Sequence, residues 1–245
     1  MLSLDPEASA AATPVPPPHS PYWLFYDEVA AAQLTGWLPR RRCRVLDLSH
    51  DGPHRAEQLR DLGHEVVRVG VGPVDGVHTV RADSRSLGWL RDAAFDAVVA
   101  ESRALSMCLA TEETARDLAR VLRSGGRLLL VVDSLLTGLA RLADQGKWAE
   151  LADVPSADVV LVPDDDGTIT RCFWPEELQG LLEDSGFDVE WVRPRSVLTP
   201  AAVERALVKG GPEALRALVR TELQLAVERE GEASGIHLVG SARKP

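Results

Sequence analysis

The chain has 245 residues, of which 45% are hydrophobic, and this is enough apolar material for one sizeable core. Its formal net charge of -10 argues against a nucleic-acid-binding surface, because phosphate binding needs clustered Lys and Arg. No apolar run is long enough to span a membrane, and the three cysteines lack a metal-binding spacing. These features favour a single cytoplasmic α/β domain with reduced thiols, no metal site and no membrane partner.

The beginning of the chain differs from the rest in composition. Residues 1–21 are rich in Ala and Pro, which is typical of a disordered or polyproline-like tail. They lack the basic start and the apolar core of a signal peptide, so export is not expected. From Tyr22, aromatic and aliphatic residues recur at helical spacing and predict an amphipathic helix over residues 22–38. The sequence therefore predicts a tail followed by one domain over residues 22–245.

Residues 43–72 have the pattern of a strand, a tight turn, a helix and a second strand. The run 44–48 is short and apolar and contains Asp47 near its end, as expected of a parallel strand buried on both faces. A crossover this short between two apolar strands forms a right-handed βαβ unit. In open sheets of this kind ligands bind beyond the carboxyl ends of the strands, so the turn 49–54 is the predicted ligand site.

This unit resembles the first part of the class I S-adenosylmethionine (SAM)-dependent methyltransferases, particularly bacterial members that act on small molecules. In that family an acid near the end of the first strand precedes a turn with glycines at alternate positions, and a second acid ends the second strand and holds the ribose hydroxyls. This chain has side chains at the turn positions and a glycine in place of the second acid. The matching cofactor-binding positions are Asp47, Ser49, Asp51, Gly52 and Gly70.

Two further elements resemble cofactor contacts of the same family. An aromatic residue on the leading helix, Tyr26, matches the element that covers the cofactor pocket. After a third strand, the family has an acid and a small polar residue beside the adenine ring, and Asp83 and Ser84 fit that pattern. The resemblance therefore implies that Tyr26, Asp83 and Ser84 bind SAM together with the residues of the first turn.

The resemblance extends to the C-terminus and implies the fold. It predicts a Rossmann-like, seven-stranded methyltransferase fold, with a mostly parallel sheet, an antiparallel last strand and helices on both faces. A helix and hairpin insertion is expected at about residues 134–172, and a short helix is expected to begin at Leu87. Two separate helices are expected over residues 199–207 and 215–223. The predicted strands are residues 44–48, 66–69, 77–82, 95–99, 127–130, 189–192 and 236–240.

The predicted catalytic residues are His50, His54 and Glu101. The two histidines fall on the ligand turn with an acid beside them, and imidazole can take or give a proton near neutral pH. The same composition resembles a metal site, although a solvated polar turn is the favoured alternative and no metal is predicted. Glu101 and Arg103 follow the fourth strand and are predicted substrate contacts. The other histidines, His237 included, are expected to be structural.

The resemblance implies SAM as the cofactor and transfer of a methyl group to an oxygen or nitrogen atom of a small acceptor. Two alternatives stay open. One is a pseudo-methyltransferase that has lost SAM binding and serves as a partner or regulatory subunit; the other is a SAM-independent cyclase or isomerase that uses the old cofactor cleft. A nicotinamide dehydrogenase is a weaker interpretation, because the GxGxxG fingerprint is absent.

The expected partners are a small-molecule substrate and either a second copy of the chain or a partner subunit. Positive charge is carried almost entirely by Arg, while Ala, Val and Leu abound. This bias is typical of GC-rich bacterial genomes, where many relatives of this type act on specialised metabolites. We therefore expect an acceptor from specialised metabolism.

Overall fold

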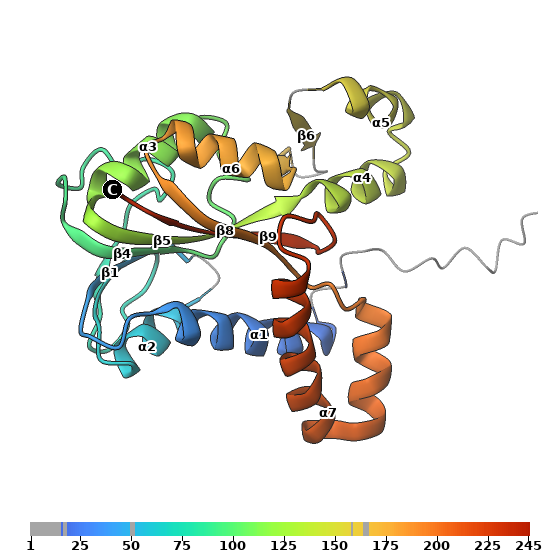
Figure 1. Cartoon of the computed structure of the whole chain (residues 1–245), viewed down its shortest axis with the longest axis horizontal. Helices are drawn as coiled ribbons and strands as arrows, with labels where there is room; N and C mark the ends of the chain where they lie inside the picture. Colours follow the sequence, from blue (N-terminus) through green and yellow to red (C-terminus); the bar gives the residue numbers. More distant parts are fainter. Residues whose placement is uncertain (1–15, 17–18, 50–51, 158, 164–166) are drawn as a thin grey trace, which may run out of the picture.

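The computed structural model describes residues 16, 19–49, 52–157, 159–163 and 167–245 and arranges them around one twisted sheet (Figure 1). Its strands are β1 (Arg44–Asp47), β2 (Glu65–Val69), β3 (His78–Val80), β4 (Phe95–Ala100), β5 (Leu122–Ser134), β6 (Val160–Pro163), β7 (Ile169–Phe173), β8 (Asp188–Arg195) and β9 (His237–Arg243). Its helices are α1 (Tyr22–Trp37), α2 (His54–Asp61), α3 (Thr111–Val121), α4 (Leu135–Asp144), α5 (Trp148–Asp153), α6 (Pro175–Asp184) and α7 (Pro200–Glu228), with a 3₁₀ turn η2 (Val154–Ser156).

The centre of the sheet is parallel. The strands lie in the order β3, β2, β1, β4, β5, and Leu46 of β1 pairs with Val67 of β2 and with Val98 of β4. Strand β9 runs antiparallel to both β5 and β8. The predicted mostly parallel sheet with an antiparallel last strand is confirmed. Because parallel neighbours end at the same edge, the carboxyl ends of β1, β4 and β5 lie together.

The predicted insertion consists of α4, α5 and the hairpin of β6 and β7, so the described sheet has nine strands instead of seven. Strand β7 pairs with Asp133 and Ser134 at the very end of β5. Asp133 also pairs with His237 of β9, so the hairpin occupies the other edge of β5, beyond the point where β4 ends. The hairpin therefore stands as a wall over the carboxyl end of β4.

Two apolar layers hold helices on the two faces of the sheet. On one face, Leu118 of α3 and Leu182 of α6 belong to a buried cluster with the strands. On the other face, Leu34 of α1 and Leu59 of α2 belong to a second buried cluster. In Figure 1, α1 and α2 lie below the sheet and α3 and α6 lie above it. The predicted helices on both faces are confirmed, and burial of these apolar side chains stabilises both layers.

The short helix that the sequence predicts from Leu87 is wrong. The backbone there makes turns, with the Leu90 N–H donating to the Leu87 carbonyl at 2.8 Å. The guanidinium group of Arg120 donates to the carbonyls of Leu87 and Leu90 at 2.9 and 2.7 Å. A side chain from α3 thus satisfies carbonyls that a helix would use itself, and the segment needs no regular structure.

Helix α7 is one element with a sharp break. Gly211 lies at φ 52 and is followed by Pro212, which cannot continue the hydrogen bonds of the preceding helix. The two predicted helices therefore form the two arms of α7, which fold back on each other (Figure 1). Val203 of the first arm is buried against Phe25 and Val29 of α1.

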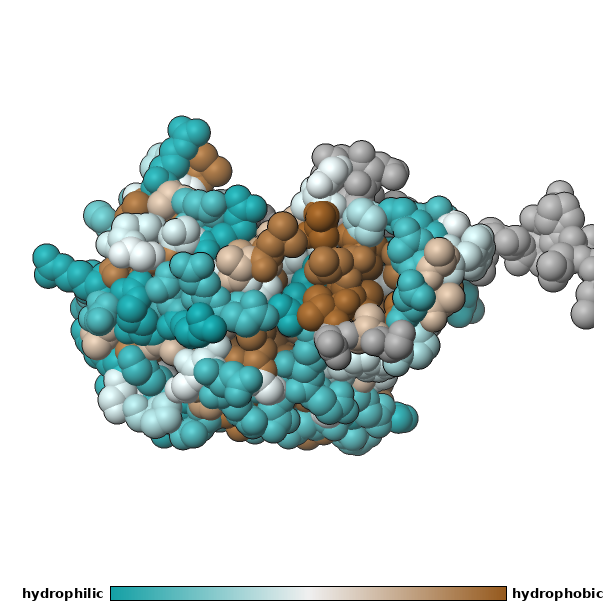
Figure 2. Space-filling model, turned by 90° about the horizontal axis from the view of Figure 1, so that it is seen from above, coloured by the Kyte–Doolittle hydropathy of each residue, from teal (hydrophilic) through white to brown (hydrophobic). Residues whose placement is uncertain are grey.

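Apolar side chains also gather on the surface of the insertion. Figure 2 shows them in a hollow above β6 and α4, where Leu136, Val159 and Leu161 are at least 40% exposed. This surface belongs to the inserted elements and not to the central strands. None of the described helices combines the length and the apolar character needed to cross a lipid bilayer.

Candidate functional site

A cleft of about 680 Å³ opens at the carboxyl ends of β1, β4 and β5. Helix α1 bounds it on one side and the β6 and β7 hairpin on the other, since Thr168 and Thr170 line it. The cleft lies where parallel sheets of this type bind ligands. Four of the predicted site residues line it together, although they come from separate elements: Tyr26, Ser49, His54 and Glu101.

The remaining predicted site residues lie elsewhere or are not described. His50 and Asp51 lie outside the described residues, so their convergence with His54 stays a prediction. Five predicted cofactor-binding residues are absent from the lining of the cleft: Asp47, Gly52, Gly70, Asp83 and Ser84. The cleft therefore brings two predicted cofactor-binding residues, Tyr26 and Ser49, together with the predicted catalytic residues His54 and Glu101, and the other five predicted cofactor-binding residues that the structure describes lie outside it.

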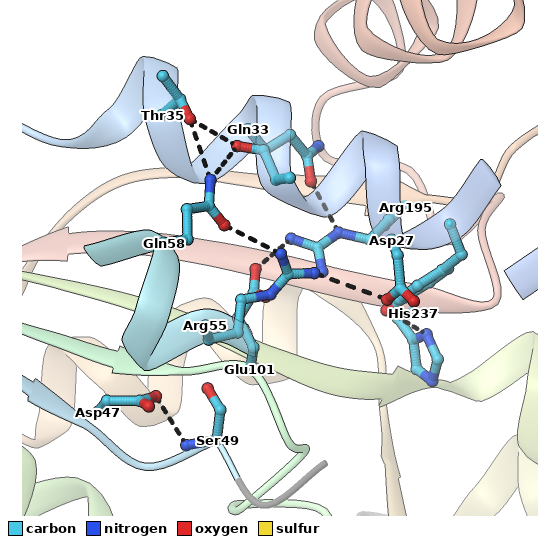
Figure 3. A network of polar contacts seen from close by, with 12 residues as sticks. Asp27, Gln33, Thr35, Asp47, Ser49, Arg55, Gln58, Glu101, Arg195 and His237 are labelled. Atoms are coloured by element: carbon cyan, nitrogen blue, oxygen red, sulfur yellow. Dashed lines mark hydrogen bonds and ion pairs between the residues drawn. The ribbon is translucent and has the colours of Figure 1, made fainter. Parts of the chain in front are cut away.

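Glu101, just beyond β4, holds two arginines together (Figure 3). Its carboxylate accepts hydrogen bonds from Arg195 at 2.8 Å and from the Nε of Arg55 at 2.5 Å. Arg195 also donates to Gln33 of α1 at 2.7 Å. Burial by itself would raise the pKa of Glu101, but the guanidinium groups of Arg195 and Arg55 outweigh it and hold the pKa below its ordinary value.

This ion-pair network ties four elements to one point. Glu101 follows β4 and Gln33 lies on α1. Arg55 is the second residue of α2, and Arg195 is the last residue of β8. Both arginine side chains and the carboxylate are almost fully buried. In this arrangement Glu101 is an ionised charge partner that fixes two cations at the cleft wall. Its predicted catalytic role stays a prediction.

A second polar chain crosses the cleft from α1 to β5. The Tyr26 hydroxyl lies 2.9 Å from Nδ1 of His237, the first residue of β9. Nε2 of the same ring lies 3.5 Å from Oδ1 of Asp133, near the end of β5. Arg103 donates to both carboxylate oxygens of Asp133 at 3.1 and 3.2 Å. All four side chains line the cleft, so His237 is part of this polar site and does not merely fill the core.

The charges around this chain set its protonation. Burial would raise the pKa of Asp133, but His237 and Arg103 outweigh it and hold the pKa below its ordinary value. Burial raises the pKa of Tyr26, and the nearby Arg195 guanidinium opposes this only in part. Asp133 is therefore an ionised acceptor while Tyr26 keeps its proton at neutral pH. Arg103 reaches Asp133 from a left-handed backbone, φ 56, a strained conformation for a non-glycine residue.

The end of β1 is fully buried. Asp47 has no exposed surface, and its Oδ1 accepts the backbone N–H of Ser49 at 2.9 Å (Figure 3). Its Oδ2 has no hydrogen-bond partner among the described residues. Burial raises the pKa of Asp47 to about 6. The acid that matches the family's first motif therefore faces the protein interior, where its charge is poorly stabilised.

The end of β2 departs from the pattern needed to hold a ribose. The guanidinium group of Arg68 donates to the carbonyls of Gly52, Val71 and Gly72 at 3.2, 3.2 and 3.4 Å. A Cβ atom added to Gly70 would lie 2.9 Å from Cζ of Arg68. The residues present thus offer the ribose hydroxyls no carboxylate, and a buried cation fills the space in front of Gly70. At this point the chain does not fit the cofactor in the arrangement described.

The adenine element is retained in sequence and carries its own ion pair. Asp83 accepts the Arg85 backbone N–H at 2.9 Å and the Arg85 guanidinium at 2.9 and 3.0 Å. Ser84 is buried beside it. The two residues lie just beyond β3, as predicted, but their contact with an adenine ring stays a prediction.

Sequence reasoning missed Arg55, Arg195 and Asp133, and it gave His237 a structural role. One feature of the sequence could have revealed the missed residues. Each lies at or near the end of a strand or at the start of the first crossover helix, where open sheets bind ligands. The sequence contains no sign that these ends pair with one another, since Arg195 and Glu101 are 94 positions apart. The three cysteines, Cys43, Cys108 and Cys172, are buried and not joined in disulfides.

Comparison with known proteins agrees with this geometry. Residues 30–130 match the family model described as "Methyltransferase domain". No curated protein matches the sequence significantly. The fold is similar to that of the 1,6-didemethyltoxoflavin-N1-methyltransferase of Burkholderia thailandensis, solved with 1,6-didemethyltoxoflavin and S-adenosylhomocysteine, at 18% identity and TM-score 0.56. That alignment covers 91% of this chain and 81% of the other.

Two further solved structures share the fold. A SAM-dependent methyltransferase from Mesorhizobium loti aligns at 17% identity and TM-score 0.57, covering 88% of this chain and 98% of the other. The 4+2 cyclase SpnF aligns at 18% identity and TM-score 0.52, covering 90% of this chain and 81% of the other. The sheet order, the match over residues 30–130 and these solved structures lead to one conclusion: the chain has the fold of the class I SAM-dependent methyltransferases.

Proposed function

We propose that the protein transfers a methyl group from SAM to an oxygen or nitrogen atom of a small polar acceptor. The observation that carries this proposal is the cleft at the carboxyl ends of β1, β4 and β5, which gathers Tyr26, Ser49, His54 and Glu101 from four separate elements. Methyl transfer needs little from a protein beyond alignment of the reactants and a group that accepts the acceptor's proton. The polar side chains that line the cleft can align the reactants, and its titratable side chains can accept the proton.

The charge of the cleft favours a polar or anionic acceptor. Its lining carries four arginines against three carboxylates, although the chain as a whole has a formal net charge of -10. The four arginines are Arg55, Arg103, Arg141 and Arg195. A local excess of positive charge in a partly enclosed site focuses the electrostatic field and attracts anions. A specialised metabolite that carries acidic hydroxyl groups is an acceptor of this class.

SAM would supply an electrophilic methyl group. The residues that would hold it are those of the first turn, with Ser49 at the cleft, and the Asp83 and Ser84 element for the adenine ring. The ribose end does not fit while Arg68 covers Gly70. The proposal therefore requires the Arg68 side chain to leave this position when the cofactor binds.

Isothermal titration calorimetry with SAM and with S-adenosylhomocysteine tests the proposal. We expect micromolar binding that is lost in Asp83→Ala and kept in Asp92→Ala, a matched variant that also removes an exposed acid paired with an arginine. Absence of binding heat at millimolar ligand, from protein with a normal unfolding transition, would refute methyl transfer from SAM. If SAM binds, polar phenols and enols would be incubated with the protein and SAM, and mass spectrometry would show whether any of them gains the mass of a methyl group.

A second function is favoured by the position of Arg68. If its guanidinium group always occupies the place of the ribose, the protein does not bind SAM. It would then act as a cyclase or isomerase in the same cleft, or as a partner subunit. The same titration separates the two functions, because this second function predicts no binding of either nucleoside. The homodimer or partner subunit, the predicted tail and the cytoplasmic location all stay predictions.

A further inference from the structure

We propose that Tyr26, His237 and Asp133 form a proton relay that accepts a proton from a weakly acidic hydroxyl group of a ligand in the cleft. This inference deepens the proposed function by naming the proton acceptor and the kind of acceptor molecule. It does not depend on SAM, because the relay consists only of side chains of this chain. The same relay would serve a cofactor-free enzyme in this cleft.

The direction of the relay follows from the donors and acceptors. An ionised carboxylate can only accept, so Asp133 orients the ring of His237 with its hydrogen on Nε2, the atom that faces Oδ1 at 3.5 Å. Nδ1 then carries a lone pair and accepts the Tyr26 hydroxyl at 2.9 Å. The phenol oxygen of Tyr26 also accepts from the Arg195 guanidinium, and its second lone pair can accept from a donor in the cleft, which Tyr26 lines.

The surrounding charges suit this direction. Arg103 and His237 contact Asp133, so the carboxylate stays ionised and stabilises a positive charge on the imidazole ring. The guanidinium group of Arg195 lies 5.4 Å from the centre of the Tyr26 ring and is held there by Glu101. A cation beside the ring favours negative charge at its oxygen and on a ligand bound next to it.

The proton transfer is balanced without any added reactant. The ligand hydroxyl gives its proton to the Tyr26 oxygen, while the Tyr26 proton moves to Nδ1 of His237. The ligand becomes an anion, the imidazole becomes a cation, and Tyr26 is restored. If SAM binds, it would supply the methyl group for the anionic oxygen, and the residues that would hold it are Ser49 and the Asp83 and Ser84 element.

The ligand class follows from the general chemistry of an imidazole base. General bases work best when their pKa lies close to that of the group they deprotonate, and an imidazole can deprotonate a phenol or an enol far more easily than an aliphatic alcohol. Arg103 and Arg195 on the two sides of the relay stabilise the resulting phenolate or enolate. The inferred acceptor is therefore a small molecule with an acidic phenol or enol.

A panel of nitrophenols and halophenols tests the relay without SAM. Their absorbance reports directly whether a bound phenol is ionised. We expect the wild-type protein to lower the apparent pKa of a bound phenol by about one unit, a tenfold change in its ionisation constant. His237→Gln and Tyr26→Phe should abolish this shift, and Asp133→Asn should reduce it.

Tyr22→Phe is the matched control. Tyr22 lies one helical turn from Tyr26, in the same aromatic cluster, but it does not line the cleft. Both substitutions remove one hydroxyl group from a packed ring, so a merely structural effect would appear in both. An equal effect of Tyr22→Phe, unchanged ionisation in His237→Gln, or failure of every phenol to bind would overturn the relay.

Imidazole nitrogen NMR gives a second readout, with His237→Gln assigning the signal. The relay predicts a hydrogen on Nε2 and a change at Nδ1 in Tyr26→Phe but not in Tyr22→Phe. A hydrogen on Nδ1 would contradict the relay. Failure of the SAM titration together with ionisation of a bound phenol would refute methyl transfer while keeping the relay, so the two outcomes are distinguishable.

Discussion

The guanidinium group of Arg68 lies directly over the α-carbon of Gly70, so that a Cβ at residue 70 would be 2.9 Å from Cζ. Arg68 is almost fully buried and donates to carbonyls of both turns that flank this point. The absence of an acid at residue 70 and the presence of Arg68 are thus one structural feature. The cation connects the turn after β1 to the turn after β2, at the position where the resemblance to the methyltransferase family implies a ribose contact.

This feature predicts that adenosine binding can be strengthened by two substitutions. In the variant Arg68→Ala with Gly70→Asp, the space is open and a carboxylate can accept the ribose hydroxyls. A hydrogen bond to a charged group contributes about 1.5 to 3 kcal/mol, which corresponds to roughly a tenfold to hundredfold gain in affinity. Calorimetry with S-adenosylhomocysteine would measure the gain relative to the wild-type protein.

Arg60→Ala is the control for this pair. Arg60 also packs over a glycine, Gly76, and also donates to a nearby carbonyl, that of Asp75, but it is only partly buried and joins no residue of the turn after β1. The Arg60→Ala substitution should leave the affinity for S-adenosylhomocysteine unchanged. An unchanged or lower affinity in the double variant, with the fold intact, would mean that Arg68 does not cover the ribose site.

The Glu101 network predicts a large loss of stability when its charge is removed. Glu101→Gln leaves Arg55 and Arg195 buried without a carboxylate, and breaking a buried ion pair in this way costs about 3 to 5 kcal/mol. Urea unfolding at neutral pH would measure the free energy of unfolding. Glu190→Gln is the control, because Glu190 also accepts from an arginine, Arg127, but closer to the surface.

The free energy of unfolding of Glu190→Gln should fall by less than about 1 kcal/mol, since ion pairs near the surface are weak. Equal losses in the two variants would contradict the interpretation that Glu101 is the buried centre of the network.

The raised pKa of Asp47 predicts an unusual dependence of stability on pH. Its folded pKa of about 6 lies above the value of about 3.9 in an unfolded chain. Between these values the folded state holds a proton that the unfolded state has lost, so stability falls as pH rises from about 4 to about 6. The total loss from this group is about 3 kcal/mol, and it persists at neutral pH.

Asp47→Asn should remove this loss. The amide oxygen can still accept the Ser49 N–H, and no charge is buried. We expect the variant to be more stable than the wild-type protein at pH 8 and to differ much less at pH 4, as measured by urea unfolding across that range. Parallel stability curves for the two proteins would show that Asp47 carries no buried charge.

Gly235 and Gly180 predict opposite responses to alanine. A Cβ at Gly235, just before β9, would fall on the backbone of Arg195, which cannot move aside. Gly235→Ala should therefore cost about 1 to 3 kcal/mol through overpacking. Gly180 lies inside α6 with open space at its Cβ position. Gly180→Ala should therefore raise the free energy of unfolding by about 0.5 to 1 kcal/mol.

Thermal unfolding of both variants would measure these changes. A stable Gly235→Ala protein would show that β8 and β9 can separate at this point, and the position of Arg195 would then not be fixed by the backbone.

The sequence by itself determined the sheet, because hydrophobic periodicity and turn residues are local properties. The buried strands around Asp47 and Val98 and the inserted hairpin were predicted from such patterns, whereas the antiparallel direction of the last strand was implied by the resemblance to the methyltransferase family. The segment at Leu87 was predicted wrongly because its carbonyls are satisfied by Arg120, a residue from a distant helix. Local patterns cannot report a bond of that kind.

The functional contacts were decided by the tertiary structure. Tyr26 and His237 are 211 positions apart, and Arg195 meets Glu101 across 94 positions. The end of a strand can be read from sequence, but the partner of a charged side chain there depends on strand order and register. For this reason the sequence located the edge of the sheet at which the cleft lies, and only the fold brought Asp133, His237 and Tyr26 together there.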